Sequence, residues 1–203
     1  MTPSRDAPEV ILASTSRYRR ELVARLGLAV RCLAPDLDEE AEKKLVSHLT
    51  LDAQARHLAV AKARSLGRAH PDAVILGSDQ IGDLDGVALG KPHTVERACA
   101  QLRAMAGRTH RLHTAVAVHH AATDRTEAVV DTHELTMRAL SDAAIADYVA
   151  RDAPLDCAGS YRVEALGIAL FERVRGDDFT AVVGMPLTRV VELLARFGVG
   201  VLA

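Results

Sequence analysis

The sequence predicts an α/β protein built as two lobes of one domain, and three observations support this prediction. Short apolar runs, typical of buried strands, alternate with segments of helical periodicity. Hydrophobic residues make up 49% and charged residues 26% of the 203 residues, a balance typical of folded proteins. No repeat, low-complexity tract or long linker divides the chain. We therefore expect one domain over residues 1–203, with a flexible N-terminus at residues 1–8.

The first part of the chain begins with a strand that leads directly into a helix. Val10–Ala13 is an apolar run suited to a strand buried on both faces. Apolar residues then recur every four positions until Gly27, which favours a helix that ends there. Residues 30–35 can form a second short strand, and the acidic residues 36–40 are expected to form a loop. Ala, Leu, Lys and Arg then favour a long helix over residues 51–66.

The second part begins with another buried strand over residues 73–77. Thr94 can cap a helix that runs to Ala106. β-Branched residues in partial alternation predict two long strands, over 110–120 and 127–138, joined by a polar turn. The remaining expected elements are a helix from Ser141 to Ala150, a strand over residues 167–174, and a last helix that begins near Pro186 and ends at Phe197.

The composition excludes several classes of protein. The 25 Lys and Arg residues balance 27 Asp and Glu residues, which gives a net charge of −2, and the chain has no Trp, three Tyr and three Phe. It therefore lacks the basic surface and the stacking platforms that nucleic-acid binders use. No apolar stretch is long enough to span a membrane, and the N-terminus lacks the apolar core of a signal peptide. We expect a cytoplasmic protein without a membrane partner, and the composition disfavours a nucleic acid as partner.

The cysteines and histidines do not form a recognisable metal or disulfide pattern. Cys32, Cys99 and Cys157 are odd in number and far apart, which favours a reducing compartment over a disulfide framework. The histidines within residues 110–120 lie in strand-like segments and lack the spacing of a zinc motif. We interpret these histidines as packing or surface residues.

The first candidate site is the segment Ser14–Arg20, where a strand ends and a helix begins. It concentrates serine and threonine hydroxyls with three arginines. Free N–H groups and the positive end of the helix dipole attract anions at such a place, and arginine donors match phosphate oxygens. Alternatively, Ser16 only caps the helix and the arginines are solvated surface groups. Three like charges at the positive end of a helix favour the interpretation as an anion site.

The second candidate follows the apolar run at residues 73–77, at a strand end of the kind where open α/β sheets hold ligands. Asp79 could activate a water molecule, directly or through a metal, and the amide of Gln80 could read a polar edge of a substrate. The alternative is an Asx-type turn, in which Asp79 accepts hydrogen bonds from nearby backbone donors.

The segment Gly86–Pro92 invites comparison with a P-loop but does not match one. A P-loop has four residues between its glycines and Ser or Thr after its lysine, whereas this segment has three residues and then Pro. Lys91 can still act as a point charge for a phosphate, or it can be a solvated loop lysine. We interpret Asp83 and Asp85 as turn formers of a hairpin that leads into this segment, in preference to metal ligands.

Carboxylates at two other places complete the candidates. Asp38 and Glu39 in the acidic segment could supply oxygen ligands to Mg²⁺, although most acidic runs are solvated loops. Glu164 lies between two apolar stretches, where it could accept hydrogen bonds from a nucleobase or remain an exposed loop carboxylate.

Taken together in this order, these segments resemble the Maf family of nucleoside triphosphate pyrophosphatases. The likeness runs from Val10 to about Leu194, and within the family it is closest to the subgroup that acts on 7-methyl-GTP. The residues that carry it are Ala13–Ser16, Gly77–Gln80, Leu84–Gly86, Gly90–Pro92, Cys157–Ser160, Glu164 and Leu170–Arg173.

The resemblance implies an elongated mixed sheet flanked by helices, with a cleft between two lobes. It implies hydrolysis between the α- and β-phosphates with a divalent cation, Mg²⁺ or Mn²⁺, and a homodimer. Asp79 matches the proton acceptor, and with Glu39 it is expected to hold the metal. Ser14, Arg19 and Lys91 match the phosphate-handling positions. To these we add two further candidates from the same anion site, Ser16 and Arg20.

The resemblance also assigns the choice of base to Tyr18, Gln80 and Glu164. Methylation at N7 leaves guanine with a positive charge, which attracts a carboxylate such as Glu164 and allows an aromatic ring such as Tyr18 to stack on it. The chain departs from the family pattern at two neighbouring positions. Arg17 stands where Pro is usual, and Tyr18 stands where Trp is frequent.

Two alternative functions remain open from the sequence. One is a pyrophosphatase of the same fold that prefers dTTP and UTP, although such relatives typically carry Thr where Gln80 stands. The other is a non-catalytic regulator of cell division that binds nucleotide or nucleic acid through the arginines of residues 17–20.

Overall fold

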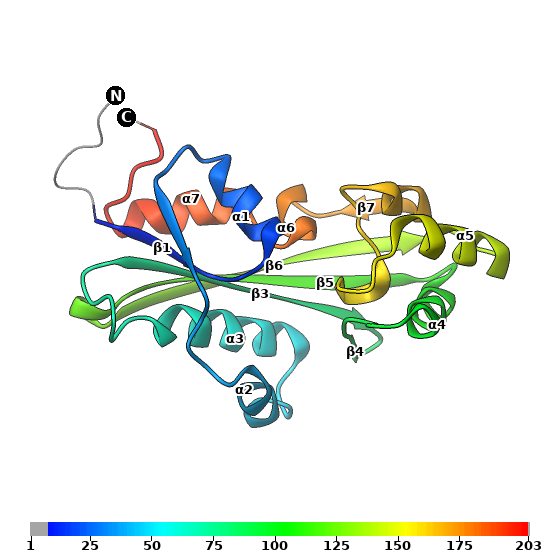
Figure 1. The fold of residues 1–203 in the computed structure, drawn as a ribbon, viewed down its shortest axis with the longest axis horizontal. Helices are drawn as coiled ribbons and strands as arrows, with labels where there is room; N and C mark the ends of the chain where they lie inside the picture. Colours follow the sequence, from blue (N-terminus) through cyan, green and yellow to red (C-terminus); the bar gives the residue numbers. More distant parts are fainter. Residues whose placement is uncertain (1–7, 203) are drawn as a thin grey trace.

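The computed structural model describes residues 8–202 and confirms the predicted α/β fold. Figure 1 shows an elongated molecule in which a long sheet carries helices on both faces. The expectation of a flexible N-terminus falls on residues 1–8, of which all but Pro8 lie outside the described residues. Within residues 8–202, no helix is long and apolar enough to cross a bilayer.

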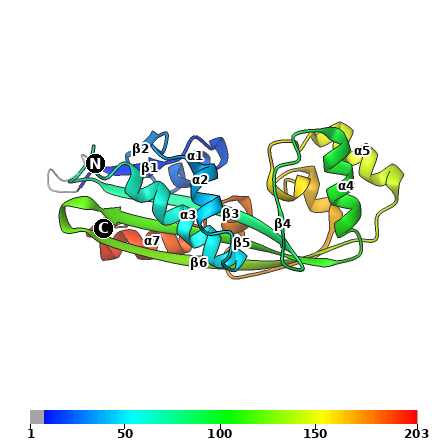
Figure 2. The same cartoon turned by 90° about the horizontal axis from the view of Figure 1, so that it is seen from below.

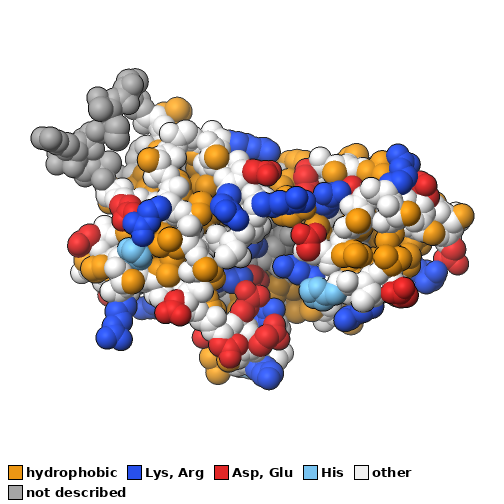
Figure 3. Space-filling view, in the orientation of Figure 1, with side chains coloured by type: hydrophobic (Ala, Val, Ile, Leu, Met, Phe, Trp, Pro, Cys, Tyr) orange, Lys and Arg blue, Asp and Glu red, His pale blue; other side chains and the backbone are white. Residues whose placement is uncertain are grey.

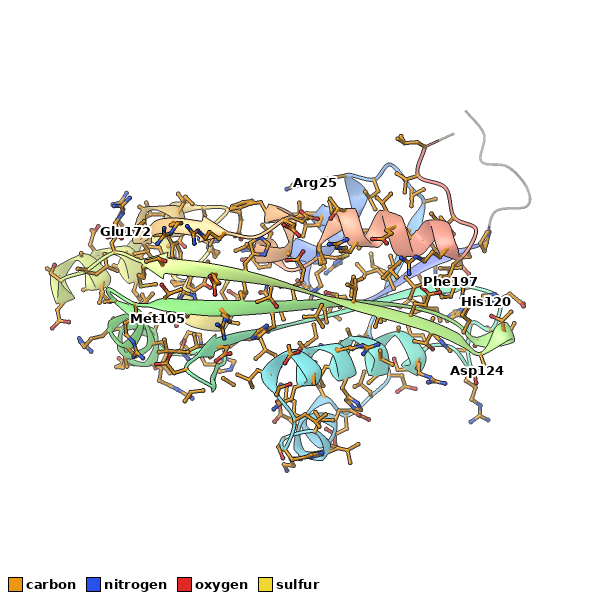
Figure 4. All side chains as sticks on the ribbon, turned by 180° about the vertical axis from the view of Figure 1, so that it is seen from behind. Arg25, Met105, His120, Asp124, Glu172 and Phe197 are labelled. Carbon is orange, nitrogen blue, oxygen red and sulfur yellow. The ribbon has the colours of Figure 1, made fainter. Side chains whose placement is uncertain are left out.

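A mixed sheet of seven strands forms the frame of the molecule. Its order is β2-β1-β3-β5-β6-β7, and the short strand β4 pairs with β3. The strands are β1 Val10–Ala13, β2 Val30–Leu33, β3 Val74–Leu84, β4 Val87–Leu89, β5 Thr109–His120, β6 Arg125–Met137 and β7 Phe171–Arg175. β1 is parallel to β2 and β3, and all other pairs are antiparallel. The long strands β5 and β6 span the molecule from the turn at Asp124 to the end near Met105 (Figure 4).

The helices divide between the two lobes. They are α1 Arg17–Ala24, α2 Glu39–Leu45, α3 Leu51–Ser65, α4 Val95–Met105, α5 Asp142–Asp152, α6 Phe179–Val183 and α7 Leu187–Arg196, with short 3₁₀ turns η1 Ala121–Thr123, η2 Ala158–Ser160 and η3 Leu166–Leu170. In the first lobe α3 covers one face of the sheet, and α1 and α7 cover the other (Figure 1). Figure 2 shows α4 and α5 grouped in the second lobe.

Alternation along the strands separates the core of the first lobe into two layers. Val10 and Leu12 of β1 pack with α1 and α7, whereas Ile11 and Ala13 pack with α3. Alanines of α3 form the helix side of the second layer. Because alanine side chains are short, α3 lies close against the sheet. A third core, which includes residues of α4, α5 and β7, fills the second lobe.

His110 is a packing residue, as the sequence predicts. It is buried in the second lobe, where its Nε2 lies 2.8 Å from the hydroxyl oxygen of Tyr161. Burial lowers the pKa of His110 to about 4, so the imidazole is neutral at physiological pH.

Among the described residues, no group of three or more His, Cys, Asp or Glu side chains is arranged to hold a metal ion.

Three predicted segments have different boundaries in the structure. The acidic segment is only partly a loop, because Asp38 caps α2 and the helix already begins at Glu39. The strand predicted over residues 167–174 begins only at Phe171, since residues 166–170 form the 3₁₀ turn η3. The strand predicted over residues 73–77 continues to Leu84 as β3, because β5 pairs with it along this length.

We expect Gly77→Ala to destabilise the protein by about 1–3 kcal/mol, because an added Cβ would lie 2.2 Å from the carbonyl oxygen of Ala59 on α3. Urea denaturation of wild type and variant measures this loss. Gly90→Ala is the matched control, since a Cβ there meets no atom within 4 Å, and it should change the free energy of unfolding by less than about 0.5 kcal/mol. Equal stability of Gly77→Ala and wild type would contradict the close packing of α3.

Candidate active site

A cleft opens where strand β3 lacks a neighbour. β1 pairs with β3 only as far as Leu76, and β4 joins β3 from Gly82 onwards. The edge of β3 between these positions therefore has no strand beside it within residues 8–202 and faces a cleft of about 960 Å³. Side chains of both lobes line this cleft, and Figure 3 shows the hollow bordered by basic and acidic groups.

Lys62 of α3 joins the two carboxylates that the sequence selects. Its Nζ donates to Asp79 Oδ1 at 2.6 Å and lies 2.9 Å from Glu39 Oε2. The side chains of Lys62 and Asp79 are only 7% and 10% exposed, so solvent screens this ion pair weakly. Asp79 lies inside β3, where it pairs with Lys62, which rules out the alternative of an Asx-type turn.

Glu39 is held at the start of α2. Its neighbour Asp38 caps the helix by accepting hydrogen bonds from two backbone N–H groups, so its carboxylate serves the helix. Partial burial alone would raise the pKa of Glu39, but the ion pairs with Lys62 and Lys43 outweigh burial and bring the pKa to about 2. Glu39 is therefore a carboxylate throughout the physiological pH range.

The N-terminus of α1 combines the helix cap and the basic group on one wall of the cleft. The Oγ of Ser16 caps α1 by accepting from the N–H of Arg19, and the N–H of Ser16 donates to Ser14 Oγ at 3.2 Å. Arg19 Nε donates to the carbonyl oxygen of Gly184 at 3.0 Å. Burial lowers the pKa of Arg19, and the nearby carboxylates counteract this effect. Ser14, Ser16 and Arg19 all line the cleft.

The other two arginines of this segment have different surroundings. Arg20 is exposed and outside the cleft lining, and its guanidinium donates to the carbonyl oxygen of Thr15 at 2.9 Å. The guanidinium of Arg17 lies 4.7 Å from the centroid of the Tyr18 ring. The structure thus brings Arg19 together with the carboxylates and leaves Arg20 apart from them.

The loop that carries Lys91 follows a hairpin whose turn is built as the sequence predicts. Asp83 Oδ1 accepts a hydrogen bond from the N–H of Gly86 at 2.6 Å, and Asp85 lies in the turn with φ = 52°. Both aspartates are therefore turn formers. β4 then leads to Lys91, which is exposed and lines the cleft.

The second lobe supplies the wall opposite α1. The hydroxyl of Tyr18 lies 3.8 Å from Cys157 Sγ, so α1 and the second lobe meet across the cleft. Burial raises the pKa of Cys157 to about 11, so the group is a neutral thiol at neutral pH. Glu164 stands on the same wall, accessible to solvent, and burial raises its pKa. Gln80 also lines the cleft.

Sequence reasoning missed Lys62, although a signal for it exists. Helical spacing places Lys62 on the face of α3 that carries Leu58, Ala59 and Ala63, all of them buried. A lysine on such a face needs a charged partner, because burying an unpaired charge is costly. Helix α6 and the glycine that ends it, Gly184, were also missed.

The carboxylates fit a divalent cation of the kind that takes few protein ligands. Oxygens of Asp79 and Glu39 both lie within 3 Å of Lys62 Nζ, so the two carboxylates are close enough to share one cation, and in this structure the Lys62 ammonium fills that place. Mg²⁺ typically takes one or two carboxylates and completes its coordination with substrate phosphates and water. Asp79 and Glu39 are the residues here that could hold such an ion.

Comparison with known proteins identifies the family of the chain. The family described as Maf-like protein matches residues 9–197. A protein of Syntrophotalea carbinolica named 7-methyl-GTP pyrophosphatase is 44% identical over 194 residues, which cover 95% of this chain and 96% of the relative. Proteins with the same name from Xanthomonas axonopodis and Thiobacillus denitrificans are 45% and 44% identical, and cover 94% and 98% of this chain and 97% of each relative.

We expect Lys62→Met to raise the pKa of Glu39 from about 2 toward its ordinary value of 4.5, because Glu39 loses its ion pair with Lys62. In the wild type, the depressed pKa contributes stability that is present above pH 4.5 and is lost as the pH falls through about 2. An NMR titration of the glutamate carboxyl carbons measures the change. Lys44→Met, at an exposed position on α2, is the control; an unaltered Glu39 titration in Lys62→Met would refute the ion pair.

Proposed function

The chain belongs to the Maf family, and on that premise we propose that it hydrolyses 7-methyl-GTP to 7-methyl-GMP and pyrophosphate. The observation that carries the proposal is the convergence of Asp79, Glu39 and Lys62 beside Arg19 in one cleft. Hydrolysis of a nucleoside triphosphate needs such a set of groups. Cationic side chains neutralise the negatively charged phosphates, and a base activates the attacking water molecule. The names of the relatives support the choice of nucleotide.

Asp79 is the proposed proton acceptor. The Oδ1 of Asp79 accepts a hydrogen bond from Lys62. The Oδ2 of Asp79 accepts no hydrogen bond from the described residues and reaches solvent in the cleft. A water molecule bound at Oδ2 can transfer a proton to the carboxylate as it attacks the phosphorus atom. Lys62 holds the carboxylate in position and balances its charge while the site waits for substrate.

The phosphates are proposed to lie between α1 and the Lys91 loop. The N–H groups and hydroxyls at the start of α1 donate to phosphate oxygens, together with Arg19. Lys91 adds a charge from the second lobe. When a triphosphate enters, Lys62 gains a second set of anionic partners, which weakens its hold on Asp79 at the moment when a base is needed.

A divalent cation completes the proposed site. Mg²⁺ or Mn²⁺, when held by Asp79 and Glu39, would supply charge neutralisation and polarise the phosphate that is attacked. The reaction is proposed to occur in the cytoplasm, where a reducing environment suits cysteines that are all unpaired in the described chain.

We expect Asp79→Asn to lower kcat by about 10²–10⁴-fold while nucleotide binding stays largely intact, because the amide cannot accept the proton. The measurement is pyrophosphate release with Mg²⁺ from 7-methyl-GTP, GTP, dTTP, UTP and CTP, with Asp72→Asn, at an exposed loop position, as control. Near-normal turnover in Asp79→Asn would contradict the assignment of Asp79 as the proton acceptor. Preference for dTTP and UTP would favour the alternative pyrophosphatase, and no hydrolysis of any nucleotide would favour the regulator.

Replacement of Glu164 by Gln should lower the preference for 7-methyl-GTP over GTP by at least about fivefold, because the cationic base loses a favourable charge worth about 1 kcal/mol. Competition between the two nucleotides measures the ratio of kcat/KM. In the wild type, the preference should also fall when acidification protonates Glu164. This loss should occur at a pH above 4.5, the ordinary pKa of glutamate, because burial raises the pKa of Glu164. Glu172→Gln on β7, outside the cleft lining, is the control.

A further inference from the structure

The amide of Gln80 is held by three groups behind the cleft wall. Its Nε2 lies 2.8 Å from the carbonyl oxygen of Ala181, 3.2 Å from that of Val182 and 3.0 Å from Thr114 Oγ1. Thr114 is fully buried on β5, directly opposite Gln80 in the β3–β5 pairing. Gln80 is thus anchored on one side and borders the cleft on the other.

The anchoring groups determine which end of the amide faces them. Carbonyl oxygens of Ala181 and Val182 can only accept hydrogen bonds. The hydroxyl of Thr114 donates its own proton to the Ala181 carbonyl at 2.9 Å, so it also accepts from Gln80. Every partner therefore demands a donor, and the amide nitrogen must point toward them. A reversed amide would place an oxygen against three acceptors.

Helix α6, which supplies the two carbonyls, is itself held firmly. Its N-cap Asp178 is buried and accepts from the N–H of Thr180 at 2.9 Å and from the N–H of Thr188 at 2.8 Å. These bonds join the start of α6 to the first turn of α7. Because the anchor is fixed at both helices, the orientation of Gln80 is fixed before substrate arrives.

The oxygen of Gln80 is the end of the amide that remains for a ligand. Its Oε1 accepts no hydrogen bond from residues 8–202, and it reaches solvent in the cleft. Glu164, which lines the same cleft, is a second acceptor once it is ionised. The side chains proposed to read the base thus offer hydrogen-bond acceptors, which a base can meet only with donors.

We propose that Thr114 and the α6 carbonyls hold Gln80 as an obligatory hydrogen-bond acceptor, and that the site therefore requires the 2-amino group of a guanine-type base. This inference rests on the proposed function. Guanine carries two neighbouring donors, N1–H and the 2-amino group, whereas hypoxanthine lacks the 2-amino group and adenine places an acceptor at N1. Methylation at N7 leaves the 2-amino group in place as a donor. Thr114 is a positioning residue, since it acts through Gln80.

The test compares 7-methyl-GTP with 7-methyl-ITP, which differ only in the 2-amino group. In the wild type we expect kcat/KM to be at least about tenfold higher for 7-methyl-GTP, because the analogue lacks the 2-amino donor and leaves one of the two acceptors, Gln80 or Glu164, unpaired. Thr114→Val removes the hydroxyl at nearly constant volume and should bring this ratio toward one. Thr114→Ser keeps the hydroxyl and should preserve the ratio. Both substrates meet the same preparation, so a loss of folded protein cancels from the ratio.

Calorimetric binding of 7-methyl-GMP and 7-methyl-IMP to the wild type provides a second measurement that needs neither turnover nor a variant. A tenfold weaker affinity for 7-methyl-IMP supports the inference. The inference is overturned if the two triphosphates have equal kcat/KM and the two monophosphates bind with equal affinity. In that case, hydrolysis of 7-methyl-GTP still leaves the proposed function intact. A ratio in Thr114→Val as high as in the wild type overturns the positioning role. If neither triphosphate is hydrolysed, the proposed function fails independently of the binding result.

Discussion

The architecture of the site depends on one uninterrupted strand, β3, that passes from the first lobe into the second. Successive side chains of a strand point to opposite faces, so neighbours on β3 face different helices. Asp79 meets Lys62 of α3 on one face, and Gln80 meets α6 on the other. No strand of residues 8–202 pairs with this part of the edge, so the cleft is open to both side chains. One register thus positions the proposed proton acceptor and the amide proposed to bind the base side by side.

The ion pair between Lys62 and Asp79 is better explained by a role in the proposed reaction than by a contribution to the free energy of folding. Two charges that are about 90% or more shielded from solvent lose hydration, and their mutual attraction often fails to outweigh this cost relative to apolar residues of similar size. The surrounding face of α3 is otherwise built from alanine and leucine, where a further apolar residue would pack. In the proposed function, the ion pair holds the Asp79 side chain at the cleft until an anionic substrate competes for Lys62.

The sequence was sufficient for most of the frame, and it drew attention to Asp79, although this residue lies inside β3 and not at its end. Sequence analysis failed where tertiary contacts decide the structure. Apolar runs and glycine stops predicted most strands and helices, and Asp79 stood out because it follows such a run. Sequence analysis did not identify Lys62, because its ion pair joins residues 17 positions apart. Helix α6 escaped because its five residues are too few for a periodic pattern, and its capping Asp178 makes its bonds partly with α7. No local pattern shows that a backbone carbonyl will orient a distant amide.

The long strands β3, β5 and β6, which extend from one lobe into the other, also govern how the cleft can change its width. Where a flexible loop joins two lobes, they can rotate as rigid bodies about a few dihedral angles. Here such a rotation would break the ladder of hydrogen bonds that runs from Ile75 to Asp83 along β5. Any narrowing around a nucleotide must instead be spread as a small change of twist over many residues. The continuous sheet therefore resists large changes in the spacing of the two lobes.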